Sequence, residues 1–300
     1  GQMGDDAIQG DGSVIDDAGR VTIDVRLTRA SVEDLGGVGS DGDDYIEGNG
    51  GDDLVFGNLG QDDVVGDSSD RFSLVARAMR PAGADILFGG AGTRIERNDP
   101  GANPDDCAPS VDGHSRDADT LLGDNGNIFR LVGTNGQALS PAAFLSFNYD
   151  LSAAGHKVIP RAFALLDYTQ GARGPGDRGT DDLIHGESGD DTIQGMTGND
   201  VLFGEGENDD IYGGSGYDRI YGGTGDDGIL GDDGKIRTSR NGLTEPLNSV
   251  FTASTQTLLE MPGPFIGAVI HIDGAIQKTV DLAAFELGSA DVIYGGLGCD

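Results

Sequence analysis

The residues best suited to chemistry are aspartates that recur at intervals of nine positions. From Gly186 to Leu230 the chain reads GESGDDTIQ, GMTGNDVLF, GEGENDDIY, GGSGYDRIY and GGTGDDGIL without interruption. Each unit has Gly at position one, usually Gly at position four, Asp at position six and an aliphatic residue at position eight. Ca²⁺ takes about six to eight oxygen ligands from carboxylates and backbone carbonyls. A glycine-rich turn that ends in aspartate offers both, so the units predict a row of calcium sites.

The same unit occurs outside this run. It appears as GQMGDDAIQ at the start, as GSDGDDYIE, GNGGDDLVF and GNLGQDDVV from Gly39, and in part as GGLGCD from Gly295. Other aspartates begin an Asp-x-aliphatic step, as in Asp182-Leu183-Ile184 and Asp291-Val292-Ile293. The candidate metal ligands are Asp6, Asp44, Asp53, Asp62, Asp182, Asp191, Asp200, Asp209, Asp218, Asp227, Asp291 and Asp300.

The spacing also predicts which aspartates share an ion. If two units make one turn of a coil, units two apart stack on the same side, and their position-six carboxylates face the same calcium. The expected pairs are Asp182 with Asp200, Asp191 with Asp209, Asp200 with Asp218, Asp209 with Asp227, and Asp44 with Asp62. On this reasoning Asp182 lies at the edge of the longest run, and its loss should matter less than the loss of Asp200 or Asp209.

The elements that position these aspartates must be tight turns and short strands. Glycine tolerates a positive φ, so the first half of each unit can turn sharply, and the last three residues form a strand with one aliphatic side chain pointing inward. One buried aliphatic residue in nine is too little core to offset an ordering entropy of about 1–2 kcal/mol per residue. Bound cations must therefore stabilise the turns.

These units resemble the glycine- and aspartate-rich nonapeptide GGxGxDxUx of the RTX (repeats-in-toxin, haemolysin-type) calcium-binding family. The resemblance implies an all-β fold, a right-handed parallel β-roll with Ca²⁺ between its turns. It also implies secretion by a one-step type I route that reads a C-terminal signal, and hence an extracellular or cell-surface location for a bacterial-type secreted protein. No N-terminal secretory signal is visible, which agrees with such a route.

The repeat is interrupted by inserts. We expect one continuous array over 1–300, a fragment of a longer protein, with roll segments at 1–9, 39–65, 177–230 and 286–300. The inserts are expected at 10–38, 66–79, 98–113, 123–176 and 231–285. Several open on Gly-Asp and close on an Asp-x-aliphatic step.

Alternating apolar residues predict strands inside the inserts, as at 21–28, 144–149 and 269–272. We expect hairpins packed along one side of the roll, with small independent β-domains as the alternative for 123–176 and 231–285. One unit, GGAGTRIER, has Arg94 in place of aspartate, so it should pair with carboxylates and not hold calcium.

Charge and missing motifs exclude several classes of protein. With 19 basic and 52 acidic residues, the net charge of −33 excludes nucleic-acid and polybasic membrane binding, and no apolar run of about 18 residues could span a membrane. HExxH and GxSxG motifs and an EF-hand loop are absent, and no two of the four histidines have metal-ligand spacing. His185 is interpreted as structural, and Cys107 and Cys299 as free thiols in preference to a disulfide. No catalytic site and no organic cofactor are predicted, so we expect the chain not to be an enzyme.

The sequence thus favours a secreted, calcium-rigidified structural or adhesive protein, such as a surface layer, filament or stalk. Its expected partners are Ca²⁺, other copies of itself, and the cell surface or matrix. Two alternatives stay open. The region could be the folding and secretion module of a larger RTX enzyme or toxin, or an adhesin whose inserts bind carbohydrate.

Overall fold

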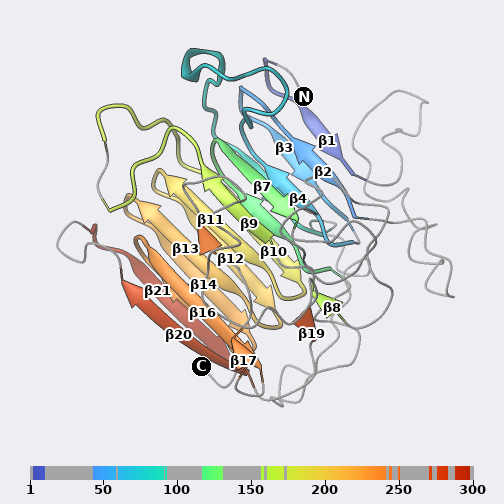
Figure 1. The fold of residues 1–300 in the computed structure, drawn as a ribbon, viewed down its shortest axis with the longest axis vertical. Helices are drawn as coiled ribbons and strands as arrows, with labels where there is room; N and C mark the ends of the chain where they lie inside the picture. The colour runs from blue at the N-terminus through green and yellow to red at the C-terminus, as the bar shows by residue number, and fades with distance from the viewer. Residues whose placement is uncertain are drawn as a thin grey trace, which may run out of the picture.

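The structure is a computed structural model in which two parallel β-sheets lie against each other (Figure 1). It describes residues 3–10, 43–58, 60–90, 92, 117–130, 157–158, 161–171, 174–240, 243–244, 249–250, 270–271, 276–282 and 288–297. The predicted strands at 21–28 and 144–149, together with Arg94, Cys107, Cys299 and Asp300, lie outside the described residues.

Successive repeat units contribute strands to the two sheets in turn. The seven-stranded sheet has the order β1 (Ala7–Gln9), β3 (Leu54–Phe56), β5 (Ile86–Phe88), β10 (Leu183–Ser188), β12 (Val201–Gly206), β14 (Arg219–Thr224) and β21 (Val292–Leu297). The six-stranded sheet has the order β15 (Gly228–Leu230), β13 (Asp210–Ser215), β11 (Thr192–Thr197), β6 (Thr120–Leu122), β4 (Asp63–Val65) and β2 (Tyr45–Glu47). All strand pairs in both sheets are parallel. Two units therefore make one turn of the coil, and the predicted parallel β-roll is confirmed.

The position-eight residues form the core between the two sheets. Because strand side chains alternate, the middle residue of each three-residue strand points inward while positions seven and nine point outward. Register keeps the inward residues in line, as in Ile184 opposite Leu202 and Leu202 opposite Ile220. The cluster comprises Ile46, Val55, Val64, Leu87, Leu121, Ile184, Ile193, Leu202, Ile211 and Ile220, with Ile8 and Ile229 packed against it.

An aromatic row runs along the outer face of the seven-stranded sheet at position nine. It consists of Phe56, Phe88, His185, Phe203, Tyr221 and Tyr294, with neighbouring ring centroids 4.5–5.0 Å apart. His185 lies between Phe88 and Phe203, and its Nδ1 is 2.8 Å from Glu205 Oε1. This environment agrees with the structural role expected for His185.

Two inserts cover the outer face of the six-stranded sheet. In the first, β7 (Gly126–Arg130) pairs antiparallel with β9 (Arg161–Leu165), and their apolar side chains pack on Val65 and Leu122. In the second, β16 (Gly234–Arg240) pairs antiparallel with β17 (Leu243–Thr244) and β20 (Ile276–Leu282), and Ile236 packs on Tyr212 and Leu230. The described parts of both inserts thus lie along one side of the roll.

Short strands also join these two inserts to each other. The pair β18 (Ser249–Val250) with β9 is parallel. The pair β19 (Ile270–His271) with β8 (Lys157–Val158) is antiparallel, and these two strands lie near each other in Figure 1. Elsewhere a 3₁₀ turn, η3 (Arg77–Met79), lies between β4 and β5. No helix among the described residues is long and apolar enough to cross a membrane.

The core predicts a clear difference between two truncations. Leu202→Ala should lower the free energy of unfolding in calcium by about 2–5 kcal/mol, because Leu202 is fully buried between neighbours that cannot close the cavity. Tyr217→Ala, at a residue that is 67% exposed, should change it by less than about 0.5 kcal/mol. Urea unfolding monitored by far-UV circular dichroism measures both. Equal losses for the two variants would contradict this packing.

Candidate metal-binding turns

The position-six aspartates lie one above another in the turns, immediately before the strands. In the long run, Asp182 N–H donates to Asp200 Oδ1 (2.9 Å) and Asp200 N–H donates to Asp218 Oδ1 (2.9 Å). The other three pairs expected from the sequence, Asp191 with Asp209, Asp209 with Asp227, and Asp44 with Asp62, show the same contact at 2.6–3.0 Å. In each pair one carboxylate oxygen caps the backbone N–H of the neighbouring turn, and the other oxygen takes no part in this contact.

Together these contacts form two continuous columns of aspartates, which we call the aspartate columns. Beside the seven-stranded sheet the column is Asp6, Asp53, Asp85, Asp182, Asp200, Asp218 and Asp291. Beside the six-stranded sheet it is Asp44, Asp62, Asp119, Asp191, Asp209 and Asp227. The columns hold all the candidate ligands except Asp300, which lies outside the described residues.

Two members of the columns were missing from the candidate ligands, and one expectation was wrong. Asp85 and Asp119 begin Asp-x-aliphatic steps, the same pattern that identified Asp182 and Asp291. Asp85 N–H donates to Asp182 Oδ1 at 2.8 Å. Asp182 is therefore an interior member of its column and not an edge, because the chain returns to the same coil after each insert.

The second carboxylate oxygen of these aspartates is buried without a hydrogen-bond partner. This holds for Oδ2 of Asp53, Asp62, Asp85, Asp119, Asp182, Asp191, Asp200, Asp209 and Asp218. A buried acceptor left unsatisfied costs about 1–3 kcal/mol, and more when it is charged. Many carboxylate oxygens without a hydrogen-bond partner, at regularly repeated positions, indicate that the columns are suited to bind cations.

The position-one glycines leave space beside these oxygens. A Cβ added to Gly204 would lie 2.2 Å from Asp209 Oδ2 and 2.6 Å from the carbonyl oxygen of Gly222, and a Cβ on Gly186 would meet Asp191 Oδ2 and the carbonyl of Gly204 in the same way. Any side chain at position one would therefore collide with a carboxylate and with backbone.

The donor set in the turns fits a hard cation. Each turn offers a carboxylate oxygen and backbone carbonyl oxygens without nitrogen or sulfur ligands, which suits Ca²⁺. Among the residues that the structure describes, no three His, Cys, Asp or Glu side chains gather into a metal cluster. The oxygen-only chemistry of the column aspartates and turn carbonyls nevertheless fits Ca²⁺, whose positive charge would balance the stacked carboxylates.

Position five carries a further ladder that sequence reasoning missed. Asn208 N–H donates to Asp190 Oδ1 (3.0 Å), and Asp226 N–H donates to Asn208 Oδ1 (2.8 Å). On the other side of the roll, Tyr217 N–H donates to Asn199 Oδ1 at 3.1 Å. The frequent Asp or Asn at position five was the available signal, since these side chains readily accept from nearby backbone N–H groups.

Aspartates at the openings of three inserts hold the two ends of each of these inserts together. Asp67 Oδ1 accepts from Gly83 N (3.0 Å), Asp124 Oδ1 from Thr180 N (3.2 Å), and Asp232 Oδ1 from Ser289 N (2.8 Å). In each of these hydrogen bonds, the aspartate directly follows a position-one glycine. The residue that donates the N–H lies two positions before the next column aspartate in the sequence. This explains why the Gly-Asp opening recurs and how the roll stays in phase across inserts of different length.

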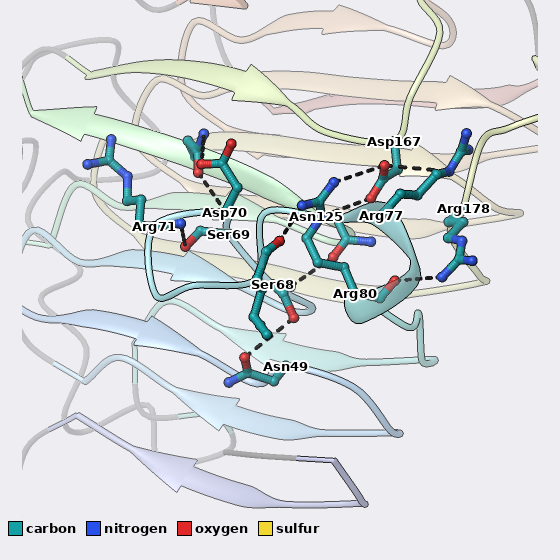
Figure 2. A network of polar contacts seen from close by, with 12 residues as sticks. Asn49, Ser68, Ser69, Asp70, Arg71, Arg77, Arg80, Asn125, Asp167 and Arg178 are labelled. Atoms are coloured by element: carbon teal, nitrogen blue, oxygen red, sulfur yellow. Dashed lines mark hydrogen bonds and ion pairs between the residues drawn. The ribbon is translucent and has the colours of Figure 1, made fainter.

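A polar network beside the turns also links two inserts (Figure 2). Arg80 makes hydrogen bonds through Nε and Nη2 to the two carboxylate oxygens of Asp167 (2.9 and 3.0 Å), and Arg77 Nε is 3.5 Å from Asp167 Oδ1. Nearby, Ser68 N–H donates to Asn125 Oδ1 at 3.1 Å. The segment between β4 and β5 is thereby fastened to the loop between β9 and β10.

Burial makes most of the column aspartates hard to ionise. Burial is the main cause that raises the pKa of Asp200 and Asp209 well above the usual range, and neighbouring column carboxylates add to it. Burial, with the Asp53 carboxylate, raises the pKa of Asp85 to about 8, and burial, with Asp291, raises that of Asp218 to about 7. Near neutral pH these buried carboxyl groups must therefore either stay protonated or have their negative charge balanced by cations.

Comparison with known proteins agrees with this geometry. The family model for the RTX calcium-binding nonapeptide repeat matches four segments, 38–71, 82–94, 178–211 and 203–235, together about a third of the chain. No curated protein and no solved structure matches the chain significantly. Strands β1, β6 and β21 lie outside the matched segments but continue the same sheets.

The continuity of the columns predicts the effect of removing single aspartates. Asp182→Ala and Asp200→Ala should raise the calcium concentration at the folding midpoint equally, by about twofold or more, since each is an interior member of one column. Asp281→Ala, which removes the same charge from an exposed position on β20, is the control and should leave the midpoint unchanged. Calcium titration followed by circular dichroism measures all three. A midpoint for Asp182→Ala that matches the control would contradict the continuous column.

The raised pKa values predict that protonation of the column carboxyl groups at low pH stabilises the roll when calcium is absent. A carboxyl group whose pKa is higher in the folded protein adds stability below its unfolded pKa of about 4, and this stability is lost as pH rises through the folded value. With chelator present, the roll should therefore be most stable near pH 4 and lose stability between pH 4 and about 7–8, the folded values of Asp218 and Asp85. Calcium at pH 8 should restore the circular dichroism spectrum. A roll that stays folded in chelator at pH 8 would refute this account.

Proposed function

Because this chain carries RTX calcium-binding nonapeptide repeats, we propose that it is a secreted protein whose β-roll folds and stiffens when it binds extracellular calcium. We further propose that its role is structural or adhesive, as part of a surface layer, filament or stalk, and that the region itself is not catalytic. The expected location is the cell exterior or surface, after secretion of the bacterial type I kind.

The observation that supports this proposal most is the continuity of the two aspartate columns. They follow both sheets from β1 and β2 to β21 and β15, so calcium would act along the whole roll and not at one local site. At about 4.8 Å between strands, seven strands make a rod about 30 Å long. Such a rod could carry load or display its inserts.

The energetics of calcium fit a switch between the inside and outside of a cell. Extracellular calcium modules have dissociation constants of about 10⁻⁴–10⁻³ M, far above free cytosolic calcium. Calcium at ten times the dissociation constant adds about 1.4 kcal/mol per site. Five such sites add about 7 kcal/mol, comparable to the whole stability of a typical domain. The chain would stay loose and exportable inside the cell and would fold outside.

A structural role predicts assemblies that depend on calcium. Negative-stain microscopy of the full-length protein in millimolar calcium should show ordered filaments or sheets, and chelation should dissolve them. Magnesium at the same concentration is the control, because it demands a stricter octahedral geometry than these turns offer. Dispersed single particles in calcium would contradict self-assembly. They would favour a secretion module of a larger enzyme or toxin, or an adhesin whose isolated inserts should then retain carbohydrate.

A further inference from the structure

Two units of the six-stranded sheet differ from the others at position seven. Asp63 on β4 and Asp210 on β13 occupy this outward position, where the neighbouring strands β6 and β11 carry Thr120 and Thr192. Both directly follow a column aspartate, so each adds a second negative charge to a crowded turn. In both cases an insert supplies a basic side chain to that position.

Lys278 of β20 reaches the turn at Asp210. Its Nζ lies 2.7 Å from Asp210 Oδ1, 2.8 Å from the carbonyl oxygen of Asp209 and 3.2 Å from that of Asn208. The two side chains of the ion pair are 9% and 3% exposed. An ammonium group has three donors, and three oxygens of a single turn accept them.

Arg161 of β9 makes the corresponding contacts at Asp63. Its Nε donates to Asp63 Oδ1 (2.8 Å), and its Nη1 donates to the carbonyl oxygen of Ala118 (3.0 Å) and to Gln61 Oε1 (3.3 Å). The arginine side chain is 2% exposed and that of Asp63 is fully buried. The guanidinium thus binds two neighbouring turns of the sheet at once.

We propose that Lys278 and Arg161 are tethered cations that hold three turns of the six-stranded sheet through contacts that do not require calcium, and thereby lower the calcium concentration at which the roll folds. This inference rests on the proposed calcium-dependent folding. The two contacts are called the Lys278 clamp and the Arg161 clamp.

The two clamps lie where they can stabilise the six-stranded sheet at both of its ends. Asp210 and Asp63 lie on the strands second from either edge of the six-stranded sheet, so the clamps hold both ends of it. The inserts that carry them are joined by the β18–β9 pair and by a hydrogen bond from the Tyr168 hydroxyl to Asp233 Oδ1 (2.9 Å). The Lys278 clamp also contacts an aspartate column directly, through the backbone of Asp209. The inserts therefore form a brace along the sheet.

The test is a calcium titration of the full chain, followed by far-UV circular dichroism. Removing one partner of a buried ion pair typically lowers a folding constant about a thousandfold or more. Spread over the same five sites, about five cooperatively bound ions, this raises the calcium midpoint about fourfold for Lys278→Met or Arg161→Met and about sixteenfold for the double variant. Lys235→Met, at an exposed lysine in the same inserted sheet, is the matched control and should follow the wild-type curve.

A second variant keeps the test decisive if Lys278→Met fails to fold. Asp210→Thr/Lys278→Met removes both charges and places at position seven the residue found at Thr192, so it should fold with a midpoint closer to wild type than Lys278→Met alone. Calcium bound per chain, measured at saturation, should be the same in the wild type and in every variant that folds.

The outcomes separate the clamps from the proposed function. A wild-type chain that folds equally well in chelator and in calcium overturns the proposed function. A wild type that responds to calcium, with Lys278→Met and Arg161→Met on the same curve, overturns the clamps alone. An additional bound ion in Lys278→Met also overturns them, because the ammonium would then be excluding calcium and not assisting it.

Discussion

The structure depends on burying negatively charged aspartate carboxylates close to one another, away from water. Two columns of aspartates stack along the roll. From the second member of each column on, one carboxylate oxygen caps the backbone N–H of the neighbouring turn, and in nine of these aspartates the other oxygen is buried without a hydrogen-bond partner. The caps fix the spacing of the coils, and the buried oxygens create a demand for positive charge. The proposed calcium-dependent folding and the expected response to acid both follow from how that demand is met.

The turn backbone reflects the same constraint. Position one must be glycine where a Cβ would strike a carboxylate and a carbonyl, as at Gly204. Position two adopts a positive φ even without glycine, as at Asn58 (86°), Met196 (73°) and Glu205 (79°). A non-glycine residue in that region costs about 1–3 kcal/mol unless its surroundings hold it there. The repeated turn is therefore a strained shape, which the column contacts hold in place together with the cations proposed to bind there.

The inserts add a second, peripheral source of order. They leave and return through Gly-Asp contacts that keep the coil in phase, and two of them cover the outer face of the six-stranded sheet. Through Lys278 and Arg161 they bring positive charge to a chain whose net charge is −33. On the seven-stranded sheet, position nine instead carries the stacked aromatic row. The same repeat therefore builds two sheets whose outer faces differ: inserts cover the six-stranded sheet, and the aromatic row lies on the seven-stranded sheet.

The sequence by itself determined the repeating unit and the pairing of aspartates two units apart, because both follow from a nine-residue period and from local turn chemistry. The parallel β-roll was implied by the resemblance of this unit to the RTX nonapeptide. The sequence predicted Asp200 and Asp209 as interior column members, but it misplaced Asp182 at an edge and omitted Asp85 and Asp119 as ligands. Only the tertiary structure showed that the coil continues across the inserts, since partners such as Asp85 and Asp182 are 97 residues apart. The contacts of Arg161 with Asp63 and of Lys278 with Asp210 were likewise decided by packing. No local period relates an insert side chain to a turn of the roll, so the burial that pairs them exists only once the chain has folded.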